Sequence, residues 1–189
     1  MTDQKPNRLS RKVGQIGLAI IAALAVVIAL ASPAYANLPH FKASSVSLAT
    51  GSSAATRSAA SSAGASAQLP DLLFTWTEVG VGTTDVNYLL STDVTATFGC
   101  VNGGGKHPSA TNKTTVTASV HSTVTLKVKN GQITASVILD TSTVFPTGFA
   151  CPGGQTLVAL SATFTHNMIT DETNGVTATD EDISVTLWP

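Results

Sequence analysis

The side chains best suited to covalent chemistry in this 189-residue chain are its two cysteines, Cys100 and Cys151. A thiol can act as a nucleophile, as a metal ligand or as half of a disulfide. The sequence has no third or fourth soft ligand at the spacing of a zinc site, and the glycine-rich flanks supply no base for a reactive thiolate. We therefore predict a structural disulfide, which would close a loop of about 50 residues and contribute roughly 4 kcal/mol in the chain-entropy model.

A glycine-rich segment follows the first cysteine and reads Asn-Gly-Gly-Gly-Lys-His-Pro over Asn102–Pro108. Glycine N–H groups next to Lys106 could cradle a phosphate. However, the motif G-x-x-x-x-G-K-[ST] is not met, and no predicted helix follows to supply a positive N-terminus. The simpler interpretation is a loop that turns tightly beside the disulfide. We keep Asn102, Lys106 and His107 as a candidate loop for a ligand or partner.

The other metal-binding and catalytic residue types form no local motif. No two of the four histidines, His40, His107, His121 and His166, are spaced as H-x-H or H-x-x-x-H, although a site assembled from distant residues stays open. No G-x-S-x-G elbow occurs, and the carboxylates make a weak case for a glycosidase pair. We expect no cofactor, and catalysis is the less favoured interpretation.

Acidic residues gather in Asp171-Glu172 and Asp180–Asp182, on either side of a predicted turn at Asn174-Gly175. If that turn has two residues, Asp171 faces Ala178 and the carboxylates do not converge. Calcium at these loop ends is conceivable because hard oxygen ligands are present. Solvated turn charges are the favoured interpretation.

Alternating apolar and polar residues indicate the strands that must hold these groups. The pattern covers residues 72–77, 86–90, 94–100, 116–128, 133–139, 158–164, 176–178 and 183–187. The stretch 116–128 is either one long bent strand or two strands broken near His121-Ser122. Asn130-Gly131 has the sequence of a type I′ turn, which predicts a hairpin from this stretch into 133–139.

Seven to nine short strands with threonine on the wet face indicate an all-β fold, an antiparallel β-sandwich of immunoglobulin-like architecture. A closed barrel is the alternative. Trp76 is in phase with Leu72 and Phe74 and should lie in the core. Trp188 is out of phase with the last strand, so it is the one aromatic side chain that we expect to be exposed.

The N-terminal third predicts export and a linker. Residues 1–36 have a basic start, an apolar run over Ile16–Ala31 and an A-x-A site at Ala34–Ala36, which is typical of a signal peptide. An uncleaved anchor is the alternative. Residues 37–69 are rich in Ser, Ala and Gly and are expected to be a disordered spacer, which leaves 70–189 as the disulfide-held domain.

After removal of residues 1–36, six basic and ten acidic side chains remain, a net charge of about −4. A mildly acidic chain argues against nucleic acid, which calls for a basic face. No membrane span is expected once the signal is cleaved. The expected location is extracellular, either secreted or associated with the cell wall.

The segments Phe98–Pro108 and Cys151–Leu157, with Asn112-Lys113 between them, resemble a group of small exported actinobacterial proteins with the pattern Cys-x-Asn-Gly-Gly-Gly and Cys-Pro-Gly-Gly. The resemblance covers most of residues 90–179. It implies a two-cysteine β domain exported from a Gram-positive cell, and it supplies no catalytic residue.

The expected function is therefore non-catalytic: a secreted or envelope-associated β-sandwich with a binding or structural role. Its partner would be a component of the cell wall or another secreted protein. The alternative is a small secreted enzyme inhibitor or enzyme that uses the loops next to Cys100 and Cys151.

Overall fold

The computed structural model describes residues 38–49, 67–102 and 112–188. Within these ranges the chain forms eight β-strands and no α-helix: β1 (His40–Leu48), β2 (Leu72–Val79), β3 (Val86–Asn102), β4 (Lys113–Leu126), β5 (Gln132–Leu139), β6 (Gln155–Asp171), β7 (Val176–Asp180) and β8 (Ile183–Thr186). In the described part of the chain, no helix is long and apolar enough to cross a membrane. The predicted signal peptide, residues 1–36, lies outside the described residues.

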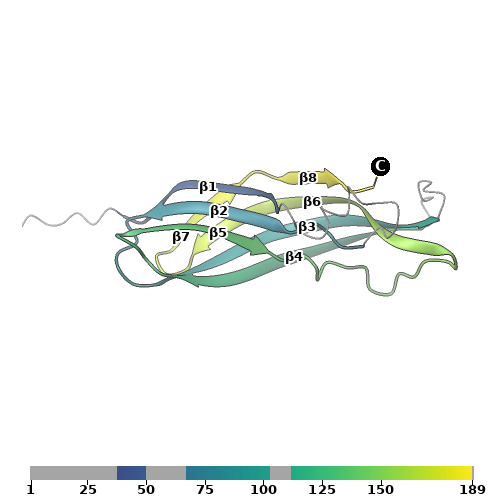
Figure 1. The fold of residues 1–189 in the computed structure, drawn as a ribbon, viewed down its shortest axis with the longest axis horizontal. Coiled ribbons are helices and arrows are strands. Elements are labelled where there is room, and N and C mark those ends of the chain that lie inside the picture. Colours follow the sequence, from purple (N-terminus) through teal and green to yellow (C-terminus); the bar gives the residue numbers. More distant parts are fainter. Residues whose placement is uncertain (1–37, 50–66, 103–111, 189) are drawn as a thin grey trace, which may run out of the picture. The chain divides into compact units, whose positions relative to one another are not determined.

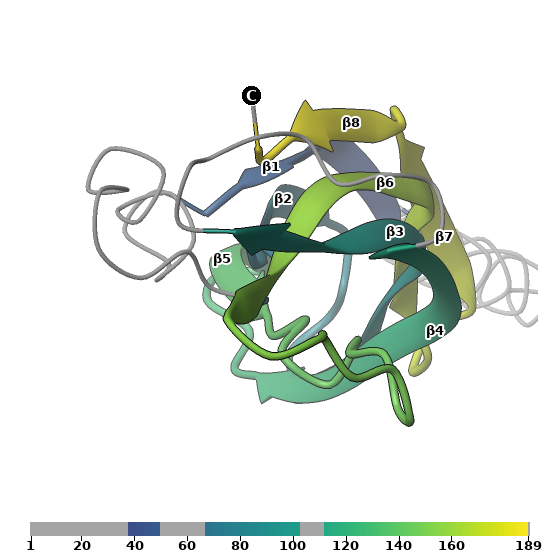
Figure 2. The same ribbon diagram turned by 90° about the vertical axis from the view of Figure 1, so that its right-hand side faces the viewer.

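The strands form two antiparallel sheets that lie face to face (Figures 1 and 2). One sheet has the order β1-β2-β5, and the other has the order β4-β3-β6-β7. Strand β8 follows β7 in the sequence and also pairs with β6. The first, second and fifth strands oppose the third, sixth and seventh, as in immunoglobulin domains, while the fourth strand lies beside the third. The predicted antiparallel β-sandwich is confirmed.

The core lies between the two sheets, because apolar residues alternate along nearly every strand. Trp76 of β2 meets Tyr88 of β3 with ring centroids 5.0 Å apart, and Trp76 is 1% exposed, which confirms its predicted place. The other large, fully buried apolar side chains are Leu72, Phe74, Leu90, Phe98, Leu139, Phe164 and Ile169.

Strands β3 and β6 are longer than the sequence pattern predicts, since β6 covers residues 155–171 where the pattern covers 158–164. Residues 86–90 and 94–100 belong to one strand, β3, since Ser91 and Asp93 continue the outward-facing row between them. The stretch that starts at Lys113 is a single strand through His121-Ser122. Because the strands are long, one sheet can bring together on one face polar residues that are far apart in the sequence.

The prediction of a disordered spacer over 37–69 is wrong for β1. This strand pairs with β2, with Val46 opposite Phe74 and Leu48 opposite Leu72. The sequence pattern did not indicate this strand because it is rich in serine and alanine. An edge strand can form with only a few apolar side chains, since its backbone also hydrogen-bonds to the neighbouring strand. Leu69 is also buried, whereas residues 50–66 lie outside the described residues.

The turn at Asn130-Gly131 forms as predicted, with φ of 55° and 72° at its two central residues. The hairpin does not form. Lys129 and Gln132 make a single bridge, after which β4 stays with β3 and β5 pairs with β2 in the other sheet. The carbonyl of Gly131 accepts hydrogen bonds from the N–H groups of Gly80 and Val81, so the turn is held against the segment that connects β2 to β3.

Candidate functional site

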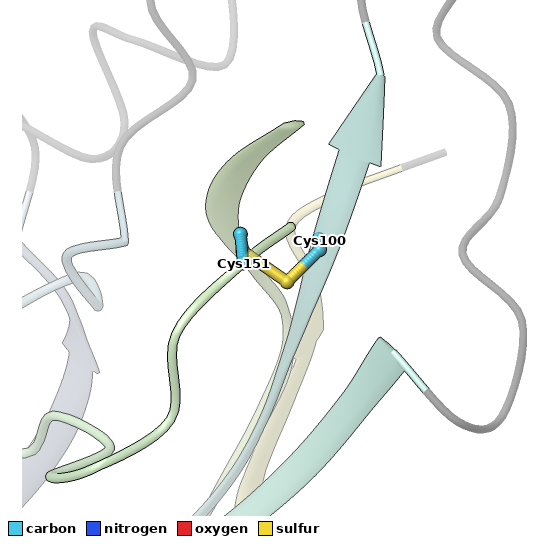
Figure 3. Close-up of a disulfide and its surroundings, with 2 residues drawn as sticks. All are labelled: Cys100 and Cys151. Atoms are coloured by element: carbon cyan, nitrogen blue, oxygen red, sulfur yellow. A yellow bond between two sulfur atoms is a disulfide. The ribbon is translucent and has the colours of Figure 1, made fainter. Parts of the chain in front are cut away.

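The disulfide between Cys100 and Cys151 is present, with an S–S distance of 2.08 Å and a Cα–Cα distance of 5.5 Å (Figure 3). It links the end of β3 to the loop before β6, as the sequence predicts. Asn102 ends β3 opposite Gln155. Lys106 and His107 lie outside the described residues, so a ligand or partner loop at this end stays a prediction.

A β-bulge in β6 places a histidine on the outer face of the larger sheet. Ser91 faces Met168 and Asp93 faces Thr165, so Thr92 alone stands opposite two residues, His166 and Asn167. His166 takes up the extra length with a left-handed φ of 52°, a conformation that is costly for a residue with a Cβ and that often occurs at functional sites.

Buried hydrogen bonds hold the bulge in place. The hydroxyl of Thr92 donates to Oδ1 of Asn167 over 2.8 Å, and the amide of Asn167 donates to the carbonyl of Glu181 over 2.7 Å. Both side chains are almost fully inaccessible to solvent. The backbone position of His166 is therefore fixed by hydrogen bonds of Thr92 and Asn167 on the buried side of the sheet.

On the outer face, Asp93 connects β4, β3 and β6. The hydroxyl of Ser119 donates to Asp93 Oδ1 over 2.5 Å, and Nδ1 of His166 lies 3.0 Å from Asp93 Oδ2. These two hydrogen bonds, that of Ser119 first, hold the pKa of Asp93 below its usual value. Ser119, Asp93 and His166, which are distant in sequence, thus form one polar cluster, the Asp93 cluster. No local sequence motif predicted it.

The order of these contacts differs from that of a catalytic triad. In a triad, histidine contacts the serine and the carboxylate orients the histidine, whereas here the carboxylate of Asp93 lies between Ser119 and His166. The hydroxyl of Ser119 contacts the carboxylate of Asp93 and not the imidazole of His166. The cluster is arranged to donate and accept hydrogen bonds at the surface. Among the described residues, no group of three or more His, Cys, Asp or Glu could hold a metal ion.

Rows of hydroxyl groups extend from this cluster across the outer face. Cross-strand pairing aligns two rows over β4, β3, β6 and β8: Thr117, Thr95, Thr163 and Ser184, and beside them Thr115, Thr97, Ser161 and Thr186. Thr163 and Ser184 are within hydrogen-bond distance at 3.2 Å. The alternation of threonine in the sequence predicts a wet face, but it cannot say which strands stand side by side.

A second polar cluster lies inside the sandwich, and sequence reasoning missed it. Glu78 of β2 is 0% exposed, and the hydroxyl of Tyr88 donates to its Oε2 over 2.6 Å. Burial raises the pKa of Glu78 to about 7, against the opposing effect of the Tyr88 hydrogen bond, and the nearby Asp171 raises it further. The sequence did carry a signal: Glu78 has the same parity as Leu72, Phe74 and Trp76.

Asp171 is buried, which corrects the interpretation of solvated turn charges for this residue, whereas Glu172, Glu181 and Asp182 are exposed. Its Oδ1 accepts the N–H groups of Thr173 and Asn174 at 2.7 and 2.9 Å, and its Oδ2 accepts the amide of Asn174 at 2.6 Å. The turn therefore has four residues, 172–175, and Asp171 faces Val176 rather than Ala178. A carboxylate that orders a turn in this way is an Asx-type cap.

The prediction of an exposed Trp188 is also wrong. The C-terminal tail follows β8 back along β6, where the backbone N–H groups of Leu187 and Trp188 donate to the carbonyl of Leu160. The Trp188 side chain is half-buried. It does not stand out from the surface as a platform for stacking.

With the fold and both clusters defined, the chain was compared with known proteins. No family model, curated protein or solved structure matches it.

Proposed function

We propose that this protein works outside the cytosol, secreted or held at the cell envelope, as a non-catalytic β-sandwich with a binding or structural role. The disulfide supports this location, because such bonds persist in oxidising compartments. The signal-like sequence of residues 1–36 supports it independently.

The observation that carries the proposed role is the outer face of the five-stranded sheet. Its hydroxyl rows and the Asp93 cluster are centred on β3 and β6, whose backbones are hydrogen-bonded to strands on both sides, so the side chains on these two strands are held in fixed positions. Such a face offers a partner many preset hydrogen-bond donors and acceptors at little cost in ordering. A component of the cell wall or a secreted protein that presents polar groups is the partner that this chemistry fits.

The first test concerns location. The full chain, expressed with its own N-terminus in a Gram-positive host, should appear outside the cytosol beginning at Asn37. Its intact mass should be that of the disulfide form, two hydrogens below the reduced form. Retention inside the cell with both thiols reduced would contradict the proposal.

The second test concerns the binding face. The purified protein should be captured by a cell-wall preparation or by secreted proteins of the host, and Thr95→Arg together with Ser184→Arg should reduce capture at least tenfold. The matched control is Thr134→Arg together with Ser136→Arg, which changes exposed hydroxyl residues on the three-stranded sheet and should leave capture unchanged. Equal effects of both pairs would exclude this face.

The second candidate function is inhibition of an enzyme by the loops next to the disulfide. The favouring observation is the bond itself, which braces the root of the loop that follows Asn102. Incubation with secreted proteases separates the two functions, because tight stoichiometric inhibition would favour the loop over the outer face.

A further inference from the structure

Strand β4 is the edge of the five-stranded sheet and pairs with β3 alone (Figure 1). It is 14 residues long, and its register with β3 runs from Val86–Leu126 to Gly99–Lys113 without a bulge. Among the described residues, no backbone hydrogen bond joins β4 to any other strand or loop. With respect to residues 38–49, 67–102 and 112–188, one side of its backbone is therefore a long row of N–H and C=O groups open to pairing.

Proteins normally protect such an edge with charges, prolines, bulges or a covering segment. Between Thr114 and Leu126 the sequence has no proline, no glycine and no Lys, Arg, Asp or Glu. Lysines stand only at the two ends, at Lys113 and just past the strand at Lys127. The central part of β4 has the composition of a strand that pairs.

The sequence of β4 indicates what it pairs with. From Thr115 to Thr125 it reads Thr-Val-Thr-Ala-Ser-Val-His-Ser-Thr-Val-Thr, which is nearly the same in both directions about Val120. Antiparallel pairing of two copies about a two-fold axis at Val120 brings each residue opposite its mirror position. The resulting pairs are Thr115 with Thr125, Val116 with Val124, Thr117 with Thr123, Ala118 with Ser122, and Ser119 with His121.

This register keeps both faces of the sheet in phase. Val116, Val124 and Val120 point toward the core side, so the second copy would add apolar side chains next to the half-buried valines at the edge. The threonines meet on the outer side and extend the hydroxyl rows. A slip by one residue would place valine on the wet face, so the alternation excludes it. Slips by two residues keep the phase, and the mirror symmetry of the sequence about Val120 distinguishes the proposed register from them.

We propose that β4 is a self-association edge, through which two copies of this chain pair antiparallel about Val120 and join their five-stranded sheets into one continuous sheet. The contact is isologous, as expected for a two-fold dimer. A two-strand seam is at the small end of protein interfaces, so the dissociation constant should be on the order of micromolar. The inference rests on β4 alone and does not require the proposed partner on the outer face.

The lysines at the strand ends give a sharp test by charge. In this register Lys113 faces Lys127 of the second copy, twice by symmetry, and these like charges oppose pairing. Lys113→Glu replaces both repulsions with attractions, so it should lower the dissociation constant about tenfold at low salt and less at high salt. Lys42→Glu makes the same charge change on β1 and should have no effect.

A disulfide trap tests the register itself. In a Thr117→Cys, Thr123→Cys variant the two introduced thiols lie six residues apart within one chain, too far to bond, but each faces its counterpart in the second copy. Mild oxidation should give a covalent dimer. A Thr115→Cys, Thr123→Cys variant, offset by two residues, should remain largely monomeric under the same oxidation.

Sedimentation equilibrium of the purified protein from micromolar to millimolar concentration completes the test. A dimer that Lys113→Glu strengthens and that the in-register thiols trap supports the proposal. A monomer at every concentration, a dimer indifferent to Lys113→Glu, or equal trapping by both thiol pairs overturns it. The first of these outcomes would mean that another segment occupies the edge, and the second that a different surface associates.

Discussion

At the scale of single residues, the least expected feature is a carboxyl group inside the sandwich. Glu78 is fully buried beside the buried Asp171, and Oε1 of Glu78 has no hydrogen-bond partner that is a donor. A proton on Glu78 would resolve this, because a protonated Oε1 can donate to the Asp171 carboxylate while Oε2 accepts the Tyr88 hydroxyl. Burial beside a second carboxylate favours the protonated form of Glu78 over two negative charges in one dry site.

The first prediction at this scale concerns the pH dependence of stability. The pKa of Glu78 rises from 4.5 to about 7 on folding, so the folded state binds more protons than the unfolded state between these values. The stabilisation is complete below about pH 4.5 and is lost as the pH rises to about 7, a decrease of roughly 3 kcal/mol in the free energy of unfolding. Urea denaturation at a series of pH values measures it.

Glu78→Gln should remove most of this decrease. The glutamine side chain reproduces the protonated form, since its oxygen can accept from Tyr88 and its N–H₂ can donate to Asp171. Contributions from groups that the substitution does not affect cancel when the variant is compared with the wild type. Glu172→Gln, in the exposed part of the neighbouring turn, is the control. A variant with the wild-type slope would contradict the assignment.

At the scale of elements, the turn after β4 has a different role from the one its sequence suggests. Asn130-Gly131 normally closes a hairpin, but here it passes the chain from the edge of one sheet to the edge of the other. The local geometry was predictable because asparagine and glycine are the residue types that adopt φ > 0 most readily at the two central positions of such a turn. The strand partners were not, because alternation specifies which face is apolar and not which sheet a strand joins.

The second prediction uses this turn. Gly131→Ala should destabilise the protein by about 1–2 kcal/mol, because Gly131 has a φ of 72°. A Cβ there would meet nothing closer than the Gly82 carbonyl oxygen at 3.9 Å, an ordinary contact, so the cost is that of the backbone conformation. Thermal or urea unfolding gives the value. Gly153→Ala, at an ordinary φ with open space around it, should be nearly neutral, and equal losses at both positions would refute this account.

At the scale of the whole molecule, the sequence predicted the fold class and most of the strands but placed the domain boundary too late. Repeated alternation of valine, leucine and threonine was enough to indicate a sandwich, and two cysteines were enough for the disulfide. The Asp93 cluster was beyond reach, since Ser119, Asp93 and His166 meet only when β4, β3 and β6 are side by side. Glu78 was within reach, because it continues the apolar parity of Leu72, Phe74 and Trp76. Asp171 was not, because the bulge at His166 moves the inward-facing positions of β6 from even to odd residue numbers.

The third prediction follows from β1. A chain that starts at residue 50 should lose roughly 3 kcal/mol of unfolding free energy relative to one that starts at residue 38, because it lacks the half-buried Phe41, Val46 and Leu48. Circular dichroism during thermal unfolding compares the two. The chain from residue 38 should be as stable as the longer protein, and equal stability of both truncations would mean that β1 is dispensable.

The position of the disulfide also bears on how the chain finds its fold. The central pairing, β3 with β6, joins residues up to 83 positions apart, as between Tyr88 and Asp171, and closing such a long loop is slow in a free chain. The bond between Cys100 and Cys151 brings these strands together at one end, next to the Asn102–Gln155 pair. An unfolded chain that keeps this bond can close the central pair from Asn102 toward Tyr88 one residue at a time, so oxidation sets a starting point for folding as well as a limit on unfolding.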